Sequence, residues 1–296
     1  MVLNGKKLVI IFIVLSILAI VLRITLVGNM NTEFGVSGTI GLIHVNGTIS
    51  EQRSVLSSRS TGSYLDLFRA AKKDDQIRAL VIRVNSPGGS AAASQELYHL
   101  VKSISESGIP VVVSMGDIAA SGAYYLASAA DYVFANGSTM TGSIGVIMEF
   151  TNYQELYEKI GINVEVLTAG DLKDAGHPTK PLSEFEHEVF SELLHDSWDQ
   201  FVSDIAAGRN LPREKVEELA DGRIFTGRQA LEHGLVDELG GIDNAIEKAK
   251  ELANIRGKAK IKNYQQQSNL SLLEMLLFSI IDIPRLTPEQ SIRLVY

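Results

Sequence analysis

The stretch "VVVSMGDIAASGAYYLASAADYVFA", residues 111–135, joins two apolar runs through a series of small residues. Residues 111–115 and 131–135 each predict a strand, and residues 121–130 between them predict a helix. One hydroxyl, that of Ser121, falls where the first strand gives way to the helix. It is either an N-cap or a nucleophile at a helix N-terminus, where the helix dipole favours developing negative charge.

Strand and helix patterns alternate on both sides of this stretch, from Thr39 to Leu167. This alternation predicts an α/β fold, with a mostly parallel sheet covered by helices. The other predicted strands are residues 39–45, 77–84, 142–148 and 163–167. The other predicted helices are residues 63–74, 94–108, 153–161, 184–207, 212–220, 227–233 and 244–253.

The N-terminal run "LVIIFIVLSILAIVLRITLV", residues 8–27, contains one charge, Arg23. Twenty helical residues span about 30 Å, the thickness of a bilayer core. Lysines at positions 6 and 7 favour a cytoplasmic N-terminus. We therefore expect a cytoplasmic tail (1–7), a single-pass anchor (8–27), a linker (28–38) and an extracytoplasmic domain. A cleaved signal peptide is the alternative, but the segment that follows the apolar run, "VGNMNTEFG", lacks an Ala-x-Ala-like cleavage site.

The composition narrows the possible functions. The 296 residues carry a net charge of -8 and no cysteine. This argues against nucleic acid as the main partner and excludes disulfides and thiolate metal sites. We expect no cofactor and no metal ion.

Residues 39–257 predict one globular domain, and residues 258–296 predict a C-terminal extension. The run "LSLLEMLLFSIIDIP" in this extension is too short to span a bilayer, so an interfacial helix, an interprotomer contact and a flexible arm remain open.

A nucleophilic serine needs a base. None of the six histidines has a recognisable triad context, and no Gly-x-Ser-x-Gly elbow surrounds Ser121. A lysine is the other possibility, since desolvation can keep an amine neutral. Lys173, in "VLTAGDLKDAGHP", follows a predicted strand end, where α/β folds place functional groups. Asp171 and Asp174 must face away from this amine if it is a base; a solvated loop lysine is the alternative.

Two further segments carry candidate groups. In "RVNSPGGS", residues 83–90, Gly88 and Gly89 expose backbone N–H groups that suit an oxyanion, although a plain strand-to-helix connection is the alternative. In "TMTGSIGVIM", residues 139–148, the hydroxyls of Thr139, Thr141 and Ser143 are each able to orient a lysine amine. Ordinary turn chemistry is the alternative for each.

Taken in order, these motifs, together with "DGRIFTGRQALEHGLVDELGG", resemble the signal peptide peptidase A family (SppA, peptidase family S49) in its single-repeat form. The resemblance covers residues 39–253. It implies a ClpP/crotonase-like fold of repeated ββα units and a Ser-Lys peptidase beside the membrane. Ser121 matches the nucleophile, Lys173 the general base and Ser143 a serine that holds the lysine. The N–H groups of Gly88 and of Ser121 itself match the oxyanion donors.

The resemblance also implies substrates and assembly. Hydrophobic peptides, including signal-peptide remnants, are the expected substrates, and a homo-oligomer of eight subunits is the expected assembly. In this assembly, Lys173 of one subunit is expected to act as the base for Ser121 of a neighbouring subunit. The chain departs from the family at "GHPTKP", which leaves Lys180 as a rival base. No histidine lies between Ser121 and His177, which disfavours a ClpP-type triad.

Three other functions remain as alternatives. A crotonase-type acyl-CoA enzyme shares the fold class, but an anchored domain outside the cell would not meet cytoplasmic acyl-CoA. A related Ser-Lys protease that cuts one specific membrane protein has the same chemistry. In a non-catalytic anchored scaffold, Ser121 would be a cap and Lys173 a solvated lysine.

Overall fold

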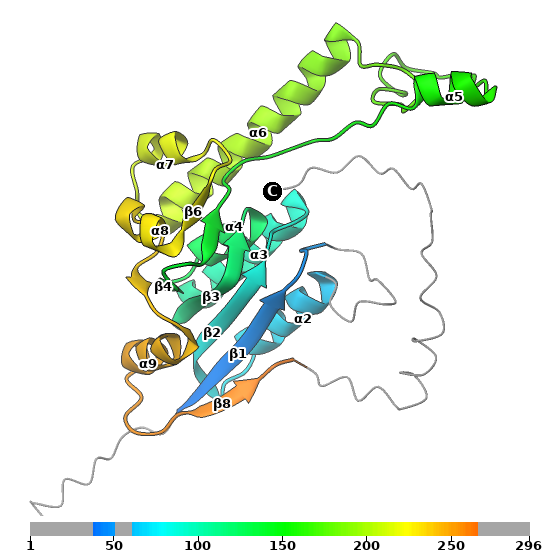
Figure 1. The fold of residues 1–296 in the computed structure, drawn as a ribbon. Helices are drawn as coiled ribbons and strands as arrows, with labels where there is room; N and C mark the ends of the chain where they lie inside the picture. Colours follow the sequence, from blue (N-terminus) through cyan, green and yellow to red (C-terminus); the bar gives the residue numbers. More distant parts are fainter. Residues whose placement is uncertain (1–37, 51–60, 266–296) are drawn as a thin grey trace, which may run out of the picture.

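The computed structural model describes residues 38–50 and 61–265. Its centre is a sheet with the strand order β6-β5-β3-β2-β1-β8, in which β4 pairs with both β3 and β7 (Figure 1). All of these strand pairs are parallel except β5 with β6. The strands are β1 (Thr39–Asn46), β2 (Ile77–Ser86), β3 (Val111–Ala120), β4 (Tyr132–Ala135), β5 (Met140–Gly142), β6 (Ile224–Thr226), β7 (Glu238–Leu239) and β8 (Lys260–Asn263).

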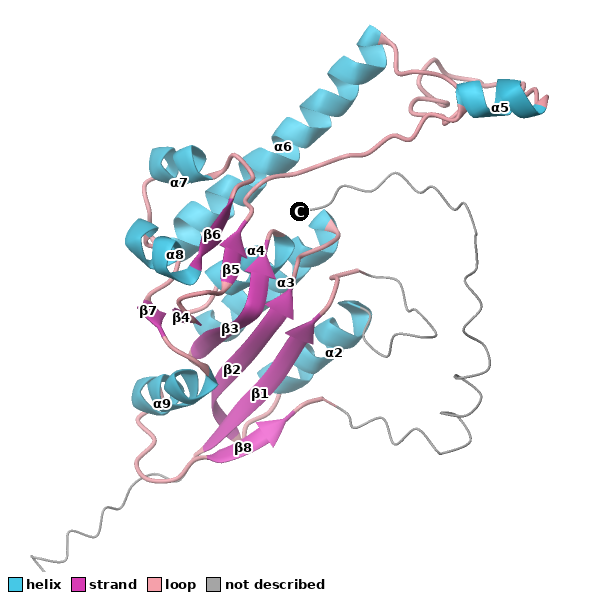
Figure 2. Cartoon of the chain, in the orientation of Figure 1, coloured by secondary structure: helices cyan, strands magenta, loops and turns pink. Residues whose placement is uncertain are grey.

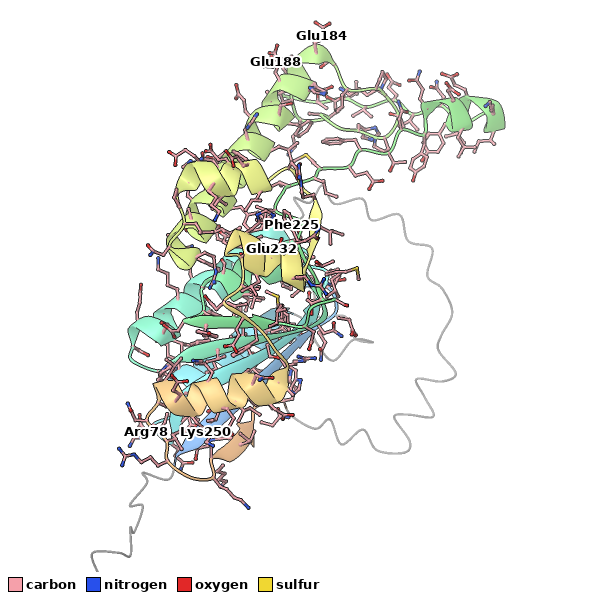
Figure 3. All side chains as sticks on the ribbon, turned by 60° about the vertical axis from the view of Figure 1, so that its left-hand side comes forward. Arg78, Glu184, Glu188, Phe225, Glu232 and Lys250 are labelled. Carbon is pink, nitrogen blue, oxygen red and sulfur yellow. The ribbon has the colours of Figure 1, made fainter. Side chains whose placement is uncertain are left out.

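Helices cover both faces of this sheet (Figure 2). The helices of the described residues are α2 (Thr61–Lys72), α3 (Ala91–Glu106), α4 (Gly122–Ser128), α5 (Gln154–Ile160), α6 (Glu184–Arg209), α7 (Arg213–Leu219), α8 (Gly227–His233) and α9 (Ile242–Leu252), of which α5 lies away from the sheet. In β2, Leu80 and Ile82 are buried in the larger core, whereas Ala79 and Val81 pack in a smaller core with residues of α9. Figure 3 shows α9 lying across its face of the sheet. Burial on both faces explains why these strands are continuous apolar runs.

The α/β fold with a mostly parallel sheet is therefore confirmed, and two of the predicted strands are wrong. The strand predicted at residues 142–148 ends at its first residue, because Gly142 and Ser143 have φ angles of 76° and 51°, outside the β region. Residues 163–167 are exposed and lie in no strand. The opening stretch also divides differently, since β3 continues through Ala120 and α4 begins at Gly122.

The predicted anchor, residues 8–27, lies outside the described residues, as does the extension from residue 266 onward. Among the residues that are described, no helix is both long enough and apolar enough to cross a membrane. The sheet itself extends past residue 257, the predicted end of the globular domain, because β8 pairs with β1.

A polar cluster fixes β8 at the edge of the sheet. Asp74, in the turn between α2 and β2, forms an ion pair with Lys262 of β8 and accepts a hydrogen bond from the Tyr264 hydroxyl at 2.5 Å. The hydrogen bond from Lys262 is the main reason that the pKa of Asp74 falls from 3.8 to about 2. The Asp74 side chain is 12% exposed, whereas that of its partner Lys262 is 42% exposed, so solvent partly screens this ion pair.

Replacing Asp74 with Asn should lower the free energy of unfolding at neutral pH by about 1 kcal/mol, because a folded-state pKa below the unfolded value stabilises the fold and solvent screens part of this effect. This stabilisation is complete above the unfolded pKa of about 4 and disappears as the pH falls towards 2. Urea unfolding of both proteins across this range tests it, with the exposed neighbour Asp75→Asn as the control. A difference between wild type and Asp74→Asn that does not shrink in acid would contradict the assignment.

Candidate active site

Ser121 lies in a strained turn between β3 and α4. Its φ and ψ angles are 56° and -125°, a region that residues other than glycine rarely adopt. It occupies the N-cap position of α4, yet its side chain makes no capping hydrogen bond. The residue is 8% exposed. A hydroxyl held on a strained strand-to-helix turn without a capping role matches the geometry that presents a nucleophile.

Backbone contacts with β5 hold this turn in place. The N–H of Ser121 donates to the carbonyl of Gly142 at 2.7 Å, and the Ser121 carbonyl accepts from the N–H of Tyr125 at 2.9 Å. Gly142 in turn packs against Phe225 of β6, which a Cβ at position 142 would approach to 2.5 Å. The conformation at Ser121 therefore depends on the β5–β6 edge of the sheet.

The two N–H groups expected to bind an oxyanion are already engaged. The N–H of Gly88 donates to the Ser86 hydroxyl at 3.1 Å, and that of Ser121 donates to Gly142. By contrast, the N–H groups of Gly89 and Gly122 have no acceptor among the described residues. A Cβ on Gly122 would lie 3.4 Å from the Gly89 nitrogen, so these two glycines adjoin. We call this pair the oxyanion cradle, after the role that is proposed for it.

Ser121 and Ser143 both line one cavity of about 480 Å³. Its walls are largely small or apolar and include Gly145, Val146, Ile147, Trp198, Ala220 and Gly222. Trp198, on α6, fixes part of this wall because its indole N–H donates to the Ala220 carbonyl at 2.9 Å. No sequence pattern pointed to Trp198, and the only signal near this wall was the motif that begins at Asp221.

Two of the three hydroxyls considered as partners for a lysine are committed elsewhere. The buried side chains of Thr139 and Thr141 donate to the backbone carbonyls of Gly116 and Ala119 at 2.6 and 2.7 Å. These bonds tie β5 and the turn before it to β3. Ser143 differs, because its backbone N–H donates to the Arg223 carbonyl at 2.8 Å while the residue lines the cavity.

Lys173 does not line this cavity. It is exposed, in the arm formed by residues 150–183, which contains α5 and projects from the sheet at the far end of α6 (Figure 1). In Figure 3, Glu184 marks the α6 end next to the arm, well away from Phe225, which packs beside Gly142. Within one chain, the candidate base and the candidate nucleophile are therefore apart.

The amine of Lys173 has no ion-pair partner among the described residues. Asp174 instead pairs with Lys180 at 3.0 Å, so it meets the condition that it face elsewhere. Lys180 also contacts Glu186 at 2.9 Å, and this hydrogen bond is the main cause that raises the pKa of Lys180. A raised pKa keeps an amine charged, which makes Lys180 a poor base. None of the six histidines lines the cavity.

Comparisons with known proteins identify the family. The model of peptidase family S49 matches residues 103–256, more than half of the chain, and a Clp protease model matches residues 51–142. The chain belongs to peptidase family S49. The resemblance noted in the sequence is thereby confirmed, as is the predicted class, a serine peptidase.

Three relatives show the extent of the similarity. The "Putative protease slr0021" of Synechocystis is 44% identical over 68% of this chain and 73% of its own length. "Serine protease SPPA, chloroplastic" of Arabidopsis thaliana is 37% identical over 75% of this chain and 33% of its own length. "Protease 4" of Haemophilus influenzae is 32% identical over 83% and 40%. The chain thus spans less than half of the length of two of these relatives.

Replacing Gly122 with Ala should lower kcat/KM at least about 100-fold, because it displaces a donor of the oxyanion cradle. The new Cβ would lie 2.2 Å from the Ser94 hydroxyl and 2.9 Å from its Cβ, so the first turn of α4 has to move. Steady-state hydrolysis of a peptide substrate measures the effect. Gly137→Ala is the matched control, since a Cβ there meets nothing within 4 Å. Wild-type kcat/KM in Gly122→Ala would exclude this cradle.

Proposed function

We propose that this chain is a membrane-anchored Ser-Lys endopeptidase that degrades hydrophobic peptides, including signal-peptide remnants, at the outer face of the cytoplasmic membrane. The proposal rests on the conformation of Ser121. Its backbone is strained, its side chain makes no capping hydrogen bond, and the residue lines a largely apolar cavity. The cavity walls suit apolar substrate side chains. Residues 8–27 are the proposed anchor, and the domain is of the ClpP/crotonase type with repeated ββα units.

In the proposed mechanism, Lys173 is neutral in a desolvated site and removes the proton of the Ser121 hydroxyl. The Ser121 oxygen attacks the peptide carbonyl carbon, and the N–H groups of Gly89 and Gly122 stabilise the oxyanion. The Lys173 ammonium then protonates the leaving amine, which departs and leaves an acyl-enzyme. Water, deprotonated by Lys173, attacks the ester, and the proton returns to Ser121 as the acid leaves. The hydroxyl of Ser143 holds the amine of Lys173.

The proposed assembly follows from the position of Lys173 on the projecting arm. Because Lys173 does not line the cavity of its own chain, we place it beside Ser121 of a neighbouring copy in a homo-oligomer of eight subunits. The arm bears exposed apolar side chains, among them Ile160 and Leu167, the latter 90% exposed. Such side chains favour burial against a partner. The contact would also supply the desolvation that a neutral lysine needs.

The test is hydrolysis of a fluorogenic hydrophobic peptide from about pH 6 to about pH 10, the range in which a lysine base loses its proton. Activity should rise with pH in the wild type and be absent in Ser121→Ala and Lys173→Ala. Lys180→Ala is the matched control for a lysine in the same arm, and it should retain activity. Hydrolysis that survives in Ser121→Ala would overturn the proposal. Hydrolysis that is lost in Lys180→Ala but not in Lys173→Ala would assign the role of general base to Lys180.

A further inference from the structure

Ser94, near the start of α3, carries a buried hydroxyl without a hydrogen-bond partner. The residue is fully buried, and its backbone N–H donates normally to the Ser90 carbonyl at 3.0 Å. Two other fully buried serines have partners: the Ser86 oxygen accepts from the Gly88 N–H, and the Ser128 hydroxyl donates to the Tyr125 carbonyl at 2.7 Å. An unpaired buried hydroxyl destabilises a fold, and an alanine in its place would not. The hydroxyl of Ser94 therefore calls for another explanation.

The position of this hydroxyl suggests one. A Cβ on Gly122 would lie 2.2 Å from the Ser94 oxygen and 3.4 Å from the Gly89 nitrogen. The Ser94 hydroxyl thus adjoins Gly122, and the Gly89 nitrogen lies beside the same glycine. Gly89 precedes α3 and Gly122 begins α4, so the side chain of Ser94 lies where the two donor-bearing segments come together.

We propose that Ser94 is a positioning residue of the oxyanion cradle, an inference that rests on the proposed function. Its side chain sets the gap between the N–H groups of Gly89 and Gly122. Its O–H dipole has no partner in the resting site and turns towards the cradle as negative charge develops on the substrate carbonyl oxygen. A dipole in a buried, water-excluded place acts on such a charge more strongly than it would in water.

The test compares Ser94→Ala with Ser128→Ala, a buried serine whose hydroxyl is paired. Ser94→Ala should melt at the same temperature as the wild type or higher, with kcat about tenfold lower and KM unchanged. The inhibition constant of a peptide aldehyde, whose hemiacetal oxygen occupies the cradle, should rise by a similar factor. Ser128→Ala should melt at a lower temperature and keep its kcat, because it loses a hydrogen bond away from the cradle.

Two results would overturn the inference about Ser94 alone. One is a wild-type kcat and aldehyde affinity in Ser94→Ala. The other is a joint fall of melting temperature and kcat, which would assign Ser94 to packing. Failure of the proposed function looks different: a wild-type protein that neither hydrolyses the peptide nor reacts with a fluorophosphonate at Ser121 would remove the nucleophile, and the role of Ser94 with it.

Discussion

Replacing Ser121 with glycine should abolish peptide hydrolysis and at the same time raise the free energy of unfolding by about 1 kcal/mol. The gain arises because glycine adopts the φ of 56° found at this position without the strain that a side chain brings. The loss of hydrolysis, at least about 10⁴-fold in kcat, arises because the acyl-enzyme cannot form without the hydroxyl. Measured together, denaturant unfolding and peptide hydrolysis separate the two roles of this residue.

The alanine variant distinguishes a nucleophile from a helix cap. If the Ser121 side chain capped α4, Ser121→Ala would lower the free energy of unfolding by about 1 kcal/mol, the usual effect of losing a cap. Since the side chain makes no capping bond, we expect Ser121→Ala to be as stable as the wild type and inactive. Ser183→Ala is the positive control, because the Ser183 side chain accepts from the Glu186 N–H at the start of α6. A loss of stability in Ser121→Ala that matches this control would show that the Ser121 side chain caps α4.

Most of the fold could be predicted because burial on both faces of the sheet leaves a direct mark on the sequence. Strands β1 to β4 are largely apolar runs, and α3, between β2 and β3, is followed by Ser107 and Gly108. The strand predicted at residues 142–148 failed for a reason that is not local. Gly142 is held by Phe225, more than eighty positions later in the chain, and no pattern around residue 142 reveals that contact.

Sequence patterns pointed to Ser121 and Ser143, which line the cavity, but not to Trp198 or to the hydrogen bonds of the candidate site. The position of Ser121 follows from one strand-to-helix junction. Which backbone N–H groups remain available depends instead on acceptors brought from other segments: the Ser86 oxygen for Gly88, and the Gly142 carbonyl for Ser121. Sequence order also cannot show whether Lys173 returns to the cavity, because that depends on the path of the whole arm.

Mixing two inactive variants, Ser121→Ala and Lys173→Ala, should restore peptide hydrolysis if the dyad forms between chains. In a mixed oligomer, a Lys173→Ala chain keeps its Ser121 and a Ser121→Ala chain keeps its Lys173. A site is complete wherever the first chain receives the arm of the second, so random equal mixing should recover about a quarter of wild-type activity. The two variants would be co-expressed in one cell with different affinity tags, purified through both tags and assayed against each variant alone.

The size of the recovery identifies the arrangement. A dyad within one chain gives none, because every chain in the mixture then lacks one member. A control mixture of Ser121→Ala with the double variant should remain inactive, since no chain in it contributes Ser121.

The mixture of Ser121→Ala with Lys173→Ala also tests the role of the arm. Replacing the exposed Leu167 with Asp in the chain that donates Lys173 should suppress the recovery, because a charge would have to be buried at the contact. Full recovery with this substituted arm would show that Lys173 reaches Ser121 without burying that side chain.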